Sequence, residues 1–118
     1  MLMKSTKTDD QENETEILQE KLQKIKEQEG IIGYILRDSK SASIDLKDPT
    51  KIIDYAALSS TAFDTGKDMN ETLQLGEIDT IVLETEETKL LSMKTNGHSL
   101  SIFMEKTVDH DKLSKSLK

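Results

Sequence analysis

Apolar residues recur along the chain at two different spacings, which predict helices and strands in turn. Leu18, Leu22 and Ile25 follow one another at helical spacing and predict an amphipathic helix. This helix is expected to begin near Asn13 and to end before Gly30, because glycine is favoured just past a helix C-terminus.

The N-terminal residues have a different character. Residues 4–16 contain no apolar side chain, a composition typical of a disordered or fraying segment. Residues 1–13 are therefore expected to form a disordered lead-in, and residues 14–118 to form one domain. A length of 118 residues also favours a single domain.

Several short apolar runs predict β-strands. The near-continuous run at 31–37 is typical of a strand covered on both faces, and the alternating residues 41–46 predict a second strand paired with it in a hairpin. Three more strands are expected at 77–85, 89–95 and 98–105. Asn96-Gly97, between the last two, is the strongest hairpin signal in the chain.

A long helix is predicted between these two groups of strands. It starts at Asp48-Pro49, where Asp can cap the helix and Pro can occupy its first position, and it runs to about Thr72. Apolar or small side chains cover about 200° of its circumference, against about 100° for an ordinary surface helix. Such a helix must be buried on two sides, and its own sheet can cover only one of them.

A short helix closes the predicted fold. It is expected from about Val108, capped by Thr107, with Leu113 and Leu117 on one face. The element order is thus α-β-β-α-β-β-β-α. Because hairpins join adjacent strands, the fold class is α+β, with a five-stranded, mainly antiparallel sheet flanked by helices.

Composition excludes several classes of function. The chain has no Cys, so disulfides, thiol catalysis and zinc–thiolate sites are excluded. The net charge is −7 and Arg37 is the only arginine, which argues against nucleic-acid binding. No apolar stretch reaches the length of a membrane span or a signal peptide. We therefore expect a cytoplasmic chain without direct membrane insertion.

Candidate catalytic chemistry is sparse. His98 and His110 are the only histidines, and neither has an evident partner for a triad or a metal pair. Asp109-His110-Asp111 lacks the Gly and the terminal Glu of a calcium loop. The Gly66 segment lacks the upstream Gly and the Ser/Thr of a P-loop. No catalytic, cofactor-binding or metal residue is assigned, and the chain is not expected to be an enzyme.

An ordered set of features resembles the roadblock dynein light-chain domain family. The set comprises the element order, the Gly-Ile-Ile-Gly entry at 30–33, the small-residue helix after 48–49 and the three closing strands. The resemblance covers about residues 14–118. Many family members carry a Gly in the first hairpin, where this chain has Asp-Ser-Lys-Ser at 38–41.

The resemblance implies a non-enzymatic scaffold that binds or regulates a small Ras-like GTPase, or organises a complex containing one. It also implies a homodimer, or a heterodimer with a paralogous roadblock subunit, with second helices packed together and third strands paired edge to edge. That dimer would bury the second side of the wide helix. The candidate interface residues are Ile52, Ala56, Ser59, Ser60, Phe63, Ile81 and Leu83.

A small-molecule-sensing domain with a PAS-like layout is the alternative. Its pocket would need aromatic side chains and convergent polar groups, and two Phe and two Tyr are few for that purpose.

Overall fold

The structure is a computed structural model that describes residues 6–38, 41–73, 80–95 and 97–117. It confirms the α+β class and the predicted order of elements. The elements are α1 (Thr6–Lys26), β1 (Ile31–Arg37), β2 (Ala42–Leu46), the 3₁₀ helix η1 (Pro49–Lys51), α2 (Ile52–Leu73), β3 (Thr80–Glu84), β4 (Thr88–Thr95), β5 (His98–Glu105) and α3 (His110–Leu117).

The five strands form one antiparallel sheet in the order β2-β1-β5-β4-β3. The first strand therefore lies beside the last at the centre, and β2 and β3 are the edge strands. The predicted strand ranges agree with the observed ones to within one residue, except that 77–79 lies outside the described residues. Gly97 has a φ of 79°, as the predicted hairpin requires, whereas Asn96 is not described.

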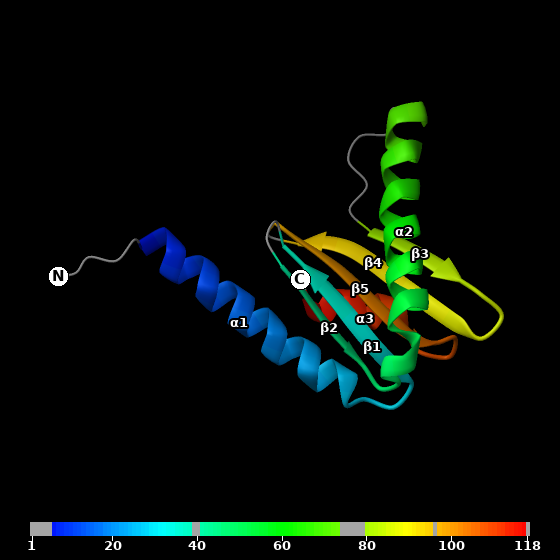
Figure 1. The fold of residues 1–118 in the computed structure, drawn as a ribbon, viewed down its shortest axis with the longest axis horizontal. Coiled ribbons are helices and arrows are strands. Elements are labelled where there is room, and N and C mark those ends of the chain that lie inside the picture. The colour runs from blue at the N-terminus through cyan, green and yellow to red at the C-terminus, as the bar shows by residue number, and fades with distance from the viewer. Residues whose placement is uncertain (1–5, 39–40, 74–79, 96, 118) are drawn as a thin grey trace.

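Helices cover both faces of the sheet. In Figure 1, α2 lies in front of the sheet and α3 lies behind it. Leu22 and Ile25 of α1 share one apolar cluster with Leu113 and Leu117 of α3, while Ala62 of α2 belongs to the cluster on the opposite face. Both faces of the central strands are thus buried, which explains the near-continuous apolar run of β1.

The first helix is longer than predicted. It begins at Thr6 rather than near Asn13, and Figure 1 shows its N-terminal part running beyond the sheet. Glu, Gln and Lys have high helix propensity, so a helix held by later apolar contacts can extend through them. Gly30 has a φ of 88°, but α1 already ends at Lys26, so this glycine serves the turn into β1.

The last helix starts later than predicted and has a different cap. It begins at His110, and the capping residue is Asp109 rather than Thr107. Oδ1 of Asp109 accepts hydrogen bonds from the backbone N–H groups of Asp111 and Lys112, both at 3.1 Å. These bonds hold the pKa of Asp109 below 3.8, with the Lys112 N–H contributing most. Asp109 is therefore explained by helix capping, and Asp111 lies in the first turn of α3, where a negative charge is favoured.

Gly33 lies where two strands approach closely. One extra residue of β1 separates Ile31 from Gly33 in the pairing with β5, which is a β-bulge. A Cβ atom at position 33 would lie 2.4 Å from the carbonyl oxygen of Asp45 and 2.7 Å from the Cα of Leu46. Both are backbone atoms of β2, so only a shift of that strand could relieve the overlap.

Replacement of this glycine should therefore destabilise the fold. We expect Gly33→Ala to lower the free energy of unfolding by about 2–4 kcal/mol, measured by urea denaturation. Gly97→Ala is the matched control, because no atom lies within 4 Å of its Cβ position and only the positive φ opposes the change. That control should lose about 1–2 kcal/mol. Equal losses in the two variants would contradict the proposed overlap.

Candidate protein interaction surface

The second helix meets the sheet through several small side chains, together with Tyr55 and Leu58. Ser59, Ala62 and Gly66 recur at helical spacing and are all buried, the first two at 1% and 0% exposure. A Cβ atom on Gly66 would lie 2.5 Å from Cδ1 of Ile81 on β3. These small residues therefore allow close contact between the helix and its own sheet.

A pair of serine hydroxyls lies inside this contact. The Oγ atoms of Ser59 and Ser101 are 2.6 Å apart and form a buried hydrogen bond between α2 and β5. Ser92 is the cross-strand neighbour of Ser101, and its buried Oγ has no hydrogen-bond partner. Because the bond satisfies both hydroxyls away from water, it fixes which side of α2 faces the sheet.

The start of this helix is fixed by Asp48, as predicted. Its Oδ1 accepts hydrogen bonds from the backbone N–H of Thr50 at 3.1 Å and from the Thr50 hydroxyl at 2.5 Å. Pro49 opens the 3₁₀ turn that leads into α2. The hydroxyl bond, followed by the backbone bond, holds the pKa of Asp48 below 3.8, because both stabilise the charged carboxylate.

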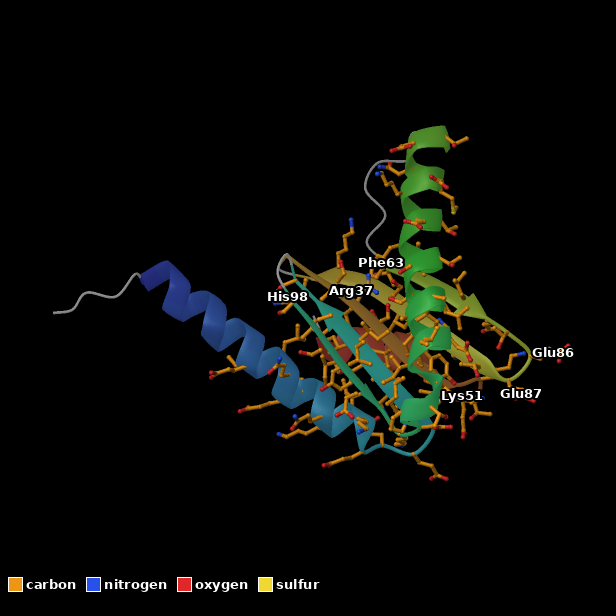
Figure 2. All side chains as sticks on the ribbon, viewed as in Figure 1. Arg37, Lys51, Phe63, Glu86, Glu87 and His98 are labelled. Atoms are coloured by element: carbon orange, nitrogen blue, oxygen red, sulfur yellow. The ribbon has the colours of Figure 1, made fainter. Side chains whose placement is uncertain are left out.

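Away from the sheet, α2 leaves large apolar side chains exposed. Ile53 is 83% exposed, Met69 is 42% exposed and Ile52 is 37% exposed. Helical geometry places Ile52, Ala56 and Phe63 along one flank. In Figure 2, Phe63 lies on the side of α2 nearer to Arg37. The sheet thus covers only part of the apolar circumference of this helix.

The edge strand β3 lies close to α2, since Gly66 of α2 approaches Ile81 of β3. The backbone N–H of Thr85 donates to the carbonyl of Thr88 at 2.8 Å. Because alternate residues of an antiparallel strand bond to the same neighbour, this bond shows which residues of β3 bond to β4 and which point outward. The backbone groups of Thr80, Val82 and Glu84 therefore point away from β4. Within the described ranges, no strand pairs with this edge.

The seven predicted interface residues have different surroundings. Ser59 faces the sheet of its own chain and has almost no surface left for a partner. Ile52 is exposed. The remaining five are half-buried, on α2 and on β3: Ala56, Ser60, Phe63, Ile81 and Leu83.

Two exposed residues of α2, Ile53 and Met69, are missing from the predicted set. Helical periodicity gives the angles between side chains but does not say which side of a wide apolar arc the sheet covers. The hydrogen-bonding partner Ser101 would have identified that side, but it lies on a distant strand. No pattern within the helix itself points to it.

The two histidines lie at the starts of two separate elements. His98 opens β5, and His110 lies in the first turn of α3 with its Nε2 3.6 Å from Oδ1 of Asp111. The described residues contain no group of three side chains that could hold a metal ion. They also contain no helix long and apolar enough to cross a membrane.

Comparison with solved structures identifies the fold. The chain is similar to the crystal structure of a roadblock/LC7 domain from Streptomyces avermitilis, with a TM-score of 0.64 and 17% sequence identity over 84% of this chain and 83% of that one. Comparison of the sequence with family models and with curated proteins gives no match. The chain therefore has the roadblock/LC7 fold, as the resemblance implied.

The bonds at the start of α2 predict a specific acid titration. Because the pKa of Asp48 is lowered in the folded state, its carboxylate stabilises the fold above pH 3.8 and loses this effect as the pH falls through the folded pKa. Thr50→Val removes the larger cause, so it should raise the pKa of Asp48 towards 3.8, as measured by NMR titration of the carboxyl group.

Thr61→Val is the control for this titration, since the Thr61 hydroxyl donates to the Ala57 carbonyl on the same helix and does not touch Asp48. An unchanged Asp48 titration in Thr50→Val, or an equal change in both variants, would contradict the assigned cause.

Proposed function

We propose that this chain is a non-enzymatic, cytoplasmic, dimeric scaffold that binds or regulates a small Ras-like GTPase, or organises a complex containing one. The roadblock/LC7 fold supports a small adaptor or regulatory role. The observation that carries the proposal is the apolar side of α2, above all Ile53, that its own sheet leaves uncovered. A second copy, or a paralogous roadblock subunit, would bury it.

The edge strand supports the same arrangement. A two-fold axis brings one patch against itself, so two β3 strands would pair antiparallel and join their sheets. Pairing centred on Val82 would place Thr80 of one copy opposite Glu84 of the other. This pairing would satisfy outward backbone groups and remove an edge that otherwise favours aggregation.

The helices would add to the strand contact. Joining the sheets through β3 keeps both α2 helices on one face, where Ile53 can be buried against the partner. An interface of standard size buries about 1,600 Å² in total, which strand pairing alone between such short edges does not supply. Ser59 is not part of this proposed interface, because it is bonded to Ser101.

A scaffold of this kind would act on a GTPase by surface complementarity. Arg37 is the only arginine available to supply a catalytic cation, and it lies at the end of β1 rather than on the proposed dimer surface. We therefore propose that any effect on GTP hydrolysis arises from positioning the switch loops of the GTPase itself.

The small-molecule-sensing alternative is less well supported. A ligand pocket in a PAS-like layout would lie between the helix and the sheet. Here the contact at Gly66 and Ile81 is close, and Ala62 is fully buried beside it.

Loss of the apolar patch should separate the dimer. Ile53→Asp places a charge where the partner helix would bury an apolar side chain. We therefore expect the dissociation constant of the dimer to rise at least about tenfold. Sedimentation velocity at micromolar concentration measures this change. Ile17→Asp is the matched control, because Ile17 is 53% exposed on α1 and should not affect assembly. A monomeric wild-type chain, or equal behaviour of both variants, would contradict the dimer.

Partner binding is tested separately by pull-down of small GTPases from the source cells, loaded with GTP or GDP. We expect at least one GTPase to be retained by the wild-type chain and by Ile17→Asp. Absence of binding in both nucleotide states would contradict the proposed role, even if the chain is a dimer.

A further inference from the structure

Three serine hydroxyls meet between α2 and the sheet. Ser59 of α2 bonds to Ser101 of β5, with the two Oγ atoms 2.6 Å apart. Ser92 of β4 is the cross-strand neighbour of Ser101, which places both on the sheet face that α2 covers. All three side chains are buried, Ser92 at 2% exposure. The group is therefore closed to bulk water and lies within a single chain.

The hydrogen bonds of these three hydroxyls are incomplete. A serine hydroxyl has one hydrogen to donate and two lone pairs to accept. The bond between Ser59 and Ser101 uses one of their two hydrogens, and the described part of the chain offers no other bond to either oxygen. Within the same ranges, the Oγ of Ser92 has no hydrogen-bond partner. Buried polar groups in native proteins are almost always paired, either with protein atoms or with ordered water.

The spacing of the two strands suits a bridging molecule. Directly opposed residues of an antiparallel pair have their Cβ atoms about 4.5–5.5 Å apart. The Oγ of Ser92 is therefore close to that of Ser101 but does not bond to it. A single water molecule can hydrogen-bond to two oxygens separated in this way.

Small side chains leave room for a molecule of this size. The neighbouring row of the sheet pairs Phe103 with Leu90, and Tyr55 of α2 packs on Phe103 with the ring centroids 4.5 Å apart. These large side chains separate the helix from the sheet at that level. One helical turn further on, at Ser59, the three serines replace them with much smaller groups. Because protein interiors are densely packed and polar cavities hold water, a buried water molecule accounts for the difference.

We propose that the three serines bind one buried water molecule between α2 and the sheet. The water accepts hydrogen bonds from Ser92 and from the remaining hydrogen of the Ser59–Ser101 pair, and it donates to the lone pairs of these oxygens. Buried waters typically make about three such bonds. The water thereby joins α2 to β4, while the direct bond joins α2 to β5. The site lies within one chain and depends neither on the dimer nor on a GTPase.

A crystal structure at a resolution that shows ordered water tests the location. We expect one water oxygen about 2.7–3.0 Å from the Oγ of Ser92 and at a similar distance from that of Ser101 or Ser59. In solution, oxygen-17 magnetic relaxation dispersion detects whole water molecules rather than hydroxyl protons. It should count one fewer long-lived water in Ser92→Ala than in the wild type.

The stability of the same variant is an independent readout. Removal of an unpartnered hydroxyl would leave stability unchanged or raise it. Because Ser92 holds the water, we expect Ser92→Ala to raise the equilibrium constant of unfolding about fivefold in urea denaturation. Ser99→Ala is the matched control, since Ser99 is half-buried on the same face of β5 and its neighbour on β4 is Lys94. That control should change the constant by less than about twofold.

Three results would overturn the proposal: no water between these oxygens in the crystal, a direct hydrogen bond from Ser92 to a protein oxygen, or unchanged or greater stability of Ser92→Ala. If Ser92→Ala does not fold, the crystal structure of the wild type still decides between a bound water and none. The comparison of Ile53→Asp with Ile17→Asp reports on the dimer and is unaffected by these outcomes.

Discussion

Close contact between the second helix and the sheet is the constraint on which the remaining surface depends. Ser59, Ala62 and Gly66 face the strands, and the Ser59–Ser101 hydrogen bond fixes the rotation of the helix. With its small residues and Tyr55 turned toward the sheet, α2 directs Ile52 and Ile53 elsewhere. The exposed apolar surface is therefore a consequence of how tightly the helix packs within one chain.

Much of the fold follows from local signals in the sequence. The strand at 31–37, the helix start at Asp48-Pro49 and the hairpin signal at Asn96-Gly97 depend on neighbouring residues only, and their predictions agree with the described structure. The start of α1 and the cap of α3 were predicted less well. At the start of each of these two helices, several polar residues could act as the cap. Contacts with the rest of the domain decide which of them does.

The interaction surface could be predicted only in part. The width of the apolar arc on α2 correctly indicates that its own sheet cannot cover the whole helix, since Ile53 stays 83% exposed. Its rotation could not be predicted, because that depends on Ser101, more than forty positions away. Small residues suited to contact with another helix are equally suited to contact with a sheet, and here the sheet uses them.

The two sheet edges provide chemically different surfaces. The β3 edge belongs to the same chain as the exposed apolar Ile53 of α2, and we propose that a like subunit covers both. At the β2 edge, Asp45 forms an ion pair with Lys26 of α1 on one face of the strand. The proposed dimer uses the β3 edge alone and leaves the β2 edge, on the far side of the sheet, outside that contact.

Hydrogen exchange along β3 tests the dimer most directly. The outward amides of Thr80, Val82 and Glu84 have no acceptor on β4 or on another strand of the described ranges, so protection that grows with protein concentration must come from another chain. We predict that their exchange slows as protein concentration rises through the micromolar range, while the amides bonded to β4 do not change in parallel. Fast exchange of all three amides at every concentration would show that no second copy pairs with this edge.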